Sequence, residues 1–251
     1  MTGVPSMLDC GNGRTLAYEH SAGHSPEIVF LGGYASDMTG SKAVFLEAHA
    51  RRLGQAFTRF DYRGHGQSPG VFEEHVISEW RDDVLAVLDH VVQGPFVLVG
   101  SSMGGWLMLL AGLERRERLR GLVGIAAAPD FTQRLMEPGL SDEQHIELAQ
   151  KGRILMPSAY GDPVPLRQGF LDDGRNNLLL GSVIEIDRPV HLLHGQLDPD
   201  VPWETSIDLA AALRSPHVTV ELVKDGDQRL SRDEDLRRIG HAVDRILDAC
   251  L

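Results

Sequence analysis

Cysteine is scarce in this chain of 251 residues: only Cys10 and Cys250 occur, one near each end. A framework of several disulfides is therefore excluded, and with it the disulfide-dense scaffolds of small secreted proteins. One bridge could still join the two ends, but two unpaired thiols in a reducing compartment are the simpler expectation. We therefore predict a cytoplasmic protein without disulfides.

Long apolar runs and an excess of positive charge are also absent. No window approaches the ~20 apolar residues of a membrane-spanning helix, and residues 1–12 lack the basic and apolar regions of a signal peptide. Basic residues number 24 against 36 acidic ones, a net charge of −12. This charge disfavours nucleic acid and anionic membranes as partners. We predict a soluble globular protein that binds a small molecule; its oligomeric state is not indicated.

What the chain does contain is an alternation of short apolar runs with stretches of helical periodicity. The runs of strand length, rich in valine, isoleucine and leucine, are 15–19, 28–31, 56–61, 96–99, 122–127, 190–193 and 218–223. Helical spacing occurs over 41–53, 78–92, 103–113, 205–213 and 233–247. This order predicts one α/β domain over residues 1–251, with a mostly parallel sheet covered by helices on both faces.

The alternation breaks over residues 130–186, which are polar and irregular, with helical character near 141–151 and 166–178. An insertion of this size between two parallel strands usually covers the carboxyl ends of the strands, where ligands bind. We predict a small cap there, although a surface excursion without a role in binding is the alternative. Its apolar residues suit an acyl or aromatic group, or form the cap's own core: Leu135, Met136, Ile154, Leu155 and Met156.

The sequence Gly100-Ser101-Ser102-Met103-Gly104 lies between a predicted strand and a predicted helix. In that context a G-x-S-x-G pattern marks the nucleophile elbow of an α/β hydrolase, which makes Ser102 the predicted nucleophile. The glycines let the neighbouring strand and helix approach a sharp, strained turn. The serine then stands at a helix N-terminus, where backbone N–H groups favour a developing oxyanion.

A serine nucleophile needs a base, an acid that orients the base, and an oxyanion hole. Asp198 follows the strand at 190–193 at the same sheet edge as Ser102 and is the predicted acid, with Asp200 as the alternative. The backbone N–H of Met103 is one predicted oxyanion donor. The other is the N–H of Tyr34, in the glycine-rich loop after the strand at 28–31.

Longer motifs narrow this assignment. They are Gly32-Gly33-Tyr34, Met38-Thr39-Gly40-Ser41-Lys42, Arg59-Phe60-Asp61-Tyr62, Gly100 to Met108, Leu192-Leu193-His194-Gly195 and Asp200-Val201-Pro202-Trp203. With them, nearly the whole chain resembles the α/β-hydrolase-domain serine hydrolases of the branch that contains the mitochondrial palmitoyl-protein thioesterase and acyl-glucuronide esterase, and its bacterial relatives. The resemblance implies hydrolysis of acyl esters or thioesters, with Ser102 as nucleophile and Asp198 as acid.

The chain departs from this pattern at Gln228, where related sequences carry the base histidine. A glutamine amide cannot accept a proton and release it again, so it is no general base. Of the 11 histidines, only His65 and His194 are expected near the active edge, and both are weak candidates. Gln228 therefore has two interpretations. The site is inactivated, by natural loss or by engineering, or its triad is atypical.

The prediction is a serine esterase or thioesterase with Ser102, Asp198 and Gln228 at the triad positions. A carbon–carbon bond hydrolase on the same fold is the enzymatic alternative, and a non-catalytic ligand-binding scaffold is the other. No metal or other cofactor is expected, because Asp198, Asp200 and His194 cluster in the sequence without a further ligand set. The substrate itself is not specified.

Overall fold

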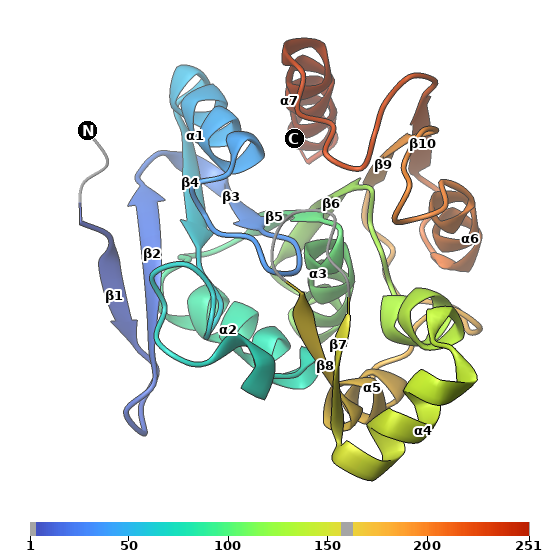
Figure 1. Cartoon of the computed structure of the whole chain (residues 1–251). Coiled ribbons are helices and arrows are strands. Elements are labelled where there is room, and N and C mark those ends of the chain that lie inside the picture. Colours follow the sequence, from blue (N-terminus) through green and yellow to red (C-terminus); the bar gives the residue numbers. More distant parts are fainter. Residues whose placement is uncertain (1–3, 157–162, 251) are drawn as a thin grey trace.

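The computed structural model describes residues 4–156 and 163–250, and eight of its strands form one sheet (Figure 1). The order across the sheet is β1-β2-β4-β3-β5-β6-β9-β10. The strands are β1 (Ser6–Asp9), β2 (Thr15–Ser21), β3 (His24–Leu31), β4 (Gln55–Phe60), β5 (Phe96–Ser101), β6 (Leu119–Ile125), β9 (Val190–Gly195) and β10 (Val218–Val223). Only β1 with β2 and β2 with β4 pair antiparallel, so the sheet is mostly parallel, as predicted.

Helices cover both faces of this sheet. On one face lie α1 (Ser41–Leu53) and α7 (Asp233–Asp248) (Figure 1). Opposite them lie α2 (Ile77–His90), α3 (Met103–Glu114) and α6 (Glu204–Ala212). The apolar stripe of each helix packs on the strands: Leu46 and Ile239 belong to one core cluster, Trp80 and Trp106 to the other. This two-sided burial is what the valine- and leucine-rich strands require.

The strand order reverses direction between β3 and β5. From β3 the chain passes through α1 to β4 on one side, and from β4 it returns through α2 to β5 on the other. In an open α/β sheet this reversal leaves a crevice outside the carboxyl ends of the two strands, which is where ligands bind. Gly32-Gly33-Tyr34 follow β3 and Ser102 follows β5, so both predicted catalytic loops meet at this crevice.

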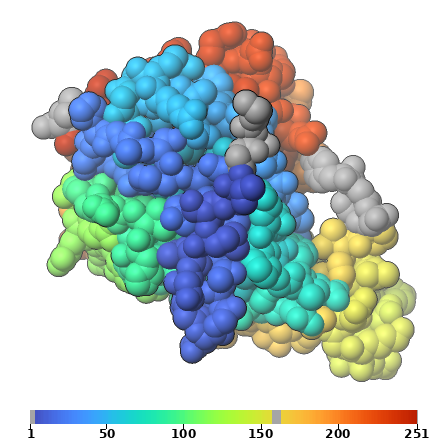
Figure 2. All heavy atoms as spheres, turned by 90° about the vertical axis from the view of Figure 1, so that its left-hand side faces the viewer, coloured from blue at the N-terminus to red at the C-terminus, as the bar shows by residue number. Residues whose placement is uncertain are grey.

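The segment between β6 and β9 forms a separate small layer. It contains η2 (Thr132–Met136), η3 (Glu137–Gly139), α4 (Asp142–Lys151), the antiparallel pair β7 (Arg153–Met156) and β8 (Val164–Arg167), and α5 (Gln168–Arg175). The helix expected at 141–151 is present. The helix expected at 166–178 is shorter in the structure. Residues 166 and 167 belong to strand β8, and α5 begins at Gln168 and ends at Arg175. Seen from the β1 edge, the yellow and yellow-green residues of α4 and β7 project from the body (Figure 2).

Hydrogen bonds tie this inserted segment to the sheet domain. The Asp130 carboxylate accepts the backbone N–H groups of Leu179 and Leu180 at 2.8 and 2.7 Å. The indole of Trp106 in α3 donates to the carbonyl of Asn177 at 3.0 Å. These bonds fix both the exit and the return of the segment, so its inner face keeps a defined position over the crevice.

Cys10 and Cys250 are both free, as expected of unpaired thiols. Across residues 4–156 and 163–250, no helix combines the length and the apolar character that a membrane crossing requires.

Candidate active site

Ser102 occupies a strained turn between β5 and α3. Its backbone lies at φ 53° and ψ −118°, a region that residues other than glycine rarely adopt. The turn is tight enough that a Cβ at Gly104 would collide with the carbonyl oxygen of Leu31, and one at Gly100 with the carbonyl of Gly104. The elbow therefore needs both glycines, and it projects the serine hydroxyl out of the sheet edge.

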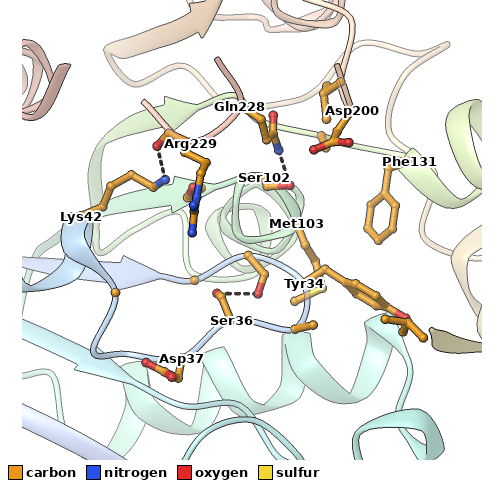
Figure 3. Close-up of a pocket in the computed structure, with 18 of the residues that line it drawn as sticks. Tyr34, Ser36, Asp37, Lys42, Ser102, Met103, Phe131, Asp200, Gln228 and Arg229 are labelled. Atoms are coloured by element: carbon orange, nitrogen blue, oxygen red, sulfur yellow. Dashed lines mark hydrogen bonds between the residues drawn. The ribbon is translucent and has the colours of Figure 1, made fainter. Parts of the chain in front are cut away.

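Gln228, in the loop between β10 and α7, faces Ser102 (Figure 3). Its amide nitrogen lies 3.1 Å from Ser102 Oγ. In this orientation the amide oxygen points at the Asp198 carboxylate, so two acceptors face each other. Turning the amide by 180° lets its nitrogen donate to Asp198, with 3.0 Å to Oδ1, and lets its oxygen accept from Ser102 Oγ at 3.1 Å. Because an ionised carboxylate cannot donate, we assign the second orientation.

The carboxylate that meets the Gln228 amide is that of Asp198. Its side chain is fully buried, and Oδ1 accepts the backbone N–H groups of Asp200 and Val201, both at 2.8 Å. These donors stabilise the carboxylate and fix its direction. Asp200 instead lines the cavity beside Ser102 with its own side chain (Figure 3). The structure thus brings together Ser102, Gln228 and Asp198, and gives Asp200 a different place.

His194 lies behind the Asp198 carboxylate. The imidazole is fully buried, with Nε2 3.2 Å from Asp198 Oδ2 and 3.0 Å from the carbonyl of Val201, and with Nδ1 2.7 Å from Ser206 Oγ. Since both neighbours of Nε2 are acceptors, Nε2 carries the proton and the Ser206 hydroxyl donates to Nδ1. His194 is therefore engaged on the far side of Asp198 and is not presented to Ser102.

His65 is committed to packing. Its ring sits edge-on to Tyr62, Phe72 and Trp80, with centroids 5.4, 4.9 and 5.0 Å away. Burial lowers the pKa of His65 to about 4, so the ring stays neutral near pH 7. It does not line the cavity that contains Ser102. Neither histidine weighed as a substitute base is thus positioned to take a proton from the serine.

The two predicted oxyanion donors are available. Met103 begins α3 and Tyr34 follows the glycines after β3. Within the described ranges, neither backbone N–H donates to a protein acceptor. A Cβ at Gly33 would lie 3.4 Å from Ser102 Cβ, so this loop passes close beside the serine. A substrate carbonyl placed against Ser102 can reach donors from both loops.

A cavity of about 730 Å³ opens beside Ser102. Tyr34 and Phe131 lie on one side of the serine, and Lys42 and Arg229 lie on the other (Figure 3). Of the five apolar residues singled out in the inserted segment, Leu135, Met136 and Met156 line this cavity. Ile154 is buried in the core, whereas Leu155 is 57% exposed. Three of the five thus face the cavity, and one belongs to the core.

Lys42 is a cavity residue to which the sequence assigned no role. It extends from the first turn of α1, and its ammonium donates to the carbonyl of Arg229 at 2.5 Å (Figure 3). Burial, assisted by the nearby Arg229, lowers the pKa of Lys42 to about 8. A single lysine at the start of an amphipathic helix carries no distinguishing signal, and its proximity to residue 229 depends on the fold. No group of three or more metal-ligating side chains occurs in the part of the chain that the structure describes.

Comparison with known proteins identifies the relatives of this site. A model of the family described as serine aminopeptidase, S33, matches residues 25–158. The mouse protein named mitochondrial palmitoyl-protein thioesterase ABHD10 is 41% identical over 97% of this chain and 82% of its own length. The chain belongs to this hydrolase family. The human protein with the same name as the mouse relative is 39% identical over 97% of this chain and 80% of its own length.

Solved structures agree with this membership. A putative hydrolase from Agrobacterium vitis S4 is 40% identical, covers 96% of this chain and 97% of its own, and superposes with a TM-score of 0.91. The mouse α/β hydrolase domain-containing protein 10 is 39% identical, covers 98% and 99%, and has a TM-score of 0.90. The α/β-hydrolase fold is confirmed, and the chain is a hydrolase, as predicted.

The predicted cytoplasmic location is contradicted by the same comparison. The curated mouse, rat, bovine and human relatives are all named as mitochondrial proteins. The prediction was wrong because unpaired thiols and net charge report on redox state and solubility. Different compartments share those properties, so neither feature distinguishes one compartment from another.

Proposed function

We propose that this chain acts on carboxylic esters or thioesters through an acyl-enzyme on Ser102, and that Gln228 holds the position of the general base without performing its chemistry. The observation that carries the proposal is the convergence of Ser102 Oγ, the Gln228 amide and the Asp198 carboxylate, with 3.1 Å between the serine and the amide. Coarser support comes from membership of a hydrolase family in which relatives about 40% identical to this chain are named palmitoyl-protein thioesterases.

With a histidine at position 228, the reaction would proceed in two halves. Ser102 Oγ would attack the acyl carbon while the imidazole took its proton, and the N–H groups of Tyr34 and Met103 would stabilise the oxyanion. The imidazolium would protonate the departing alkoxide or thiolate. Water, deprotonated by the same imidazole, would then cleave the acyl-serine and release the acid.

Gln228 preserves the hydrogen bonds of this arrangement and removes its proton transfer. In the assigned orientation the amide accepts from the serine and donates to Asp198, as a neutral imidazole would. However, a side-chain amide does not become a cation near pH 7, so the serine proton has no acceptor. We expect the chain to bind its substrate and to turn it over slowly.

The acyl group of the substrate is expected to be apolar. Tyr34 and Phe131 lie together on one side of Ser102 (Figure 3), and Leu135 and Met136 also line the cavity. Relatives at about 40% identity are named palmitoyl-protein thioesterases, and an apolar cavity supports an acyl chain as the group recognised here as well.

The decisive experiment is Gln228→His. Loss of one member of a serine triad costs roughly 10⁴ to 10⁶ in turnover, so the variant should hydrolyse p-nitrophenyl octanoate and an octanoyl thioester several orders of magnitude faster than the parent. Ser102→Ala in the same background should abolish this gain. Fluorophosphonate labelling should rise in parallel, because it requires an activated serine.

Gln168→His is the matched control, since it introduces a histidine at a residue whose side chain donates to Asp172 in the inserted segment and which is not part of the cavity lining. It should leave turnover at the parent level. Brisk turnover by the parent would show that another group is the base. A Gln228→His protein that cleaves a vinylogous 1,5-diketone but no ester would identify a carbon–carbon bond hydrolase. Binding without turnover of either class would identify a non-catalytic scaffold.

A further inference from the structure

We propose that His194 is a positioning residue for this reaction: the Nε2–H of its imidazole holds the Asp198 carboxylate in the orientation from which it can direct the base at position 228. The inference rests on the proposed function, because it concerns the acid of the same triad. His194 does not line the cavity, so it acts through Asp198 and does not touch the substrate.

The Asp198 carboxylate is a buried anion that contacts no lysine or arginine among residues 4–156 and 163–250. Its side chain has no exposed surface, and a charge in such a place is stable only if donors satisfy its oxygens. Oδ1 accepts the backbone N–H groups of Asp200 and Val201, both at 2.8 Å. Oδ2 depends instead on side chains, with His194 Nε2 at 3.2 Å and the Gln228 amide beside it.

The bond from His194 fixes the plane of this carboxylate. The terminal torsion of an aspartate is broad, so the two backbone donors on Oδ1 alone leave that plane loosely defined. A donor on Oδ2 from another direction defines it. An ionised carboxylate has about four lone-pair sites, and three are then taken by groups that do not depend on residue 228. The remaining site points at that residue.

Ser206, in α6, determines which nitrogen of His194 carries the proton. Nε2 faces only acceptors, Asp198 Oδ2 and the carbonyl of Val201, whereas Nδ1 lies 2.7 Å from Ser206 Oγ. Within the described ranges the Ser206 hydroxyl has no second acceptor, so it donates to Nδ1. His194 and Ser206 are both fully buried. Water therefore does not compete for these bonds, which are strengthened by the low dielectric around them.

The residue after His194 brings the loop that carries position 228 onto the same strand end. A Cβ at Gly195 would collide with the carbonyl of Gly226, and the N–H of Leu197 donates to that carbonyl at 2.8 Å. Backbone contacts thus set the distance between the loop and Asp198. His194 sets only the direction of the carboxylate, so its loss should leave the site assembled and the acid poorly aimed.

A pair of amide substitutions in the Gln228→His background tests this role. The amide nitrogen of glutamine is as many bonds from Cβ as the imidazole Nε2, whereas that of asparagine reaches only as far as Nδ1. His194→Gln should retain kcat for an octanoyl thioester within about threefold, and His194→Asn should lower it about ten- to hundredfold, the usual contribution of a hydrogen bond to a charged group. KM should not change in either variant, because His194 does not line the cavity.

His191→Asn is the matched control. His191 is buried in the same strand, and its Nε2 lies 3.3 Å from Glu221 Oε2, away from the triad. This variant should keep the kcat of the background. Ser206→Ala removes one hydroxyl and should lower kcat by a smaller factor than His194→Asn. A role of His194 in packing alone predicts that its two amide variants behave alike, and equal kcat values in them would overturn the proposal.

A second measurement uses the parent chain and needs no turnover. Long-range nitrogen–proton NMR spectra should show His194 with a protonated Nε2 and an unprotonated Nδ1. The side-chain amide protons of Gln228 should exchange slowly with solvent, and His194→Asn should speed this exchange about tenfold or more through loss of the bond that holds Asp198. A proton on Nδ1, or unchanged exchange, would refute the proposal. If Gln228→His stays inert toward esters, the proposed function fails while these NMR measurements still decide the role of His194.

Discussion

At position 228 a side chain can form the hydrogen bonds of an imidazole without being able to transfer a proton. The Gln228 amide satisfies a serine hydroxyl and a carboxylate together, which is the pattern that a neutral imidazole would present. The motifs were sufficient to predict that Ser102, Asp198 and residue 228 would meet, because each follows a strand at the same sheet edge. They gave no indication of Lys42, whose significance depends on a backbone carbonyl distant in the sequence.

His65 provides a residue-scale prediction about pH. Its pKa in the folded protein is about 4 against an ordinary value of 6.5. The unfolded chain therefore binds a proton at His65 more readily than the folded protein does. For this reason the free energy of unfolding falls as the pH drops from 6.5 toward 4, and this loss is absent above pH 6.5. The loss should approach about 3 kcal/mol. His65→Phe removes the titrating ring. The free energy of unfolding of this variant should therefore fall less than that of the parent between neutral pH and about pH 4.5.

Urea unfolding of the parent and the variant at both pH values checks this expectation. The exposed His241 gives the control, and His241→Asn should retain the pH dependence of the parent. Carboxyl groups such as Asp61 and Asp130, whose pKa values burial raises, titrate in every protein of the set. Only the difference between proteins therefore reports on His65. Identical pH dependence in parent and His65→Phe would show that the buried ring accepts a proton in the folded state.

At the scale of elements, hydrophobic periodicity predicted the bounds of helices and strands best in the central sheet domain. The predicted helix 41–53 and strand 218–223 match α1 and β10 at both ends. The pair β7 and β8 was not predicted, because each strand has only four residues and Pro165 interrupts the second. Their pairing depends on contact with each other and with the rest of the inserted segment, which local pattern does not encode.

The elbow provides a prediction at this scale. Gly104→Ala should lower the free energy of unfolding by about 3 kcal/mol, because the added methyl group meets the backbone of Leu31, which cannot move without disturbing β3. Gly169→Ala is the control. Gly169 lies in α5 with open space around it, so alanine there should be neutral or slightly stabilising. Chemical denaturation of the two variants and the parent measures both effects, and a Gly104→Ala protein of parental stability would contradict the packing described for the elbow.

For the whole molecule, cohesion comes from the sheet and its two helical layers without covalent support. Cys10 and Cys250 are free and partly buried, and burial raises the pKa of both thiols. Both should therefore react slowly with a thiol reagent in the native protein and rapidly after unfolding. Alkylation in denaturant without reductant should add two groups per chain by intact mass. A chain that accepted none until reduced would reveal a bridge between the ends.

The sheet pairs β6 directly with β9, although the whole inserted segment separates them along the chain. Leu122 lies opposite Val190, and the register continues to Ile125 opposite Leu193 without any contribution from the excursion between them. Loop length adds to the entropic cost of closure only slowly. Evolution can therefore exchange, lengthen or shorten this segment while the elbow beneath it is inherited unchanged, and the substrates of such enzymes can diverge faster than their chemistry.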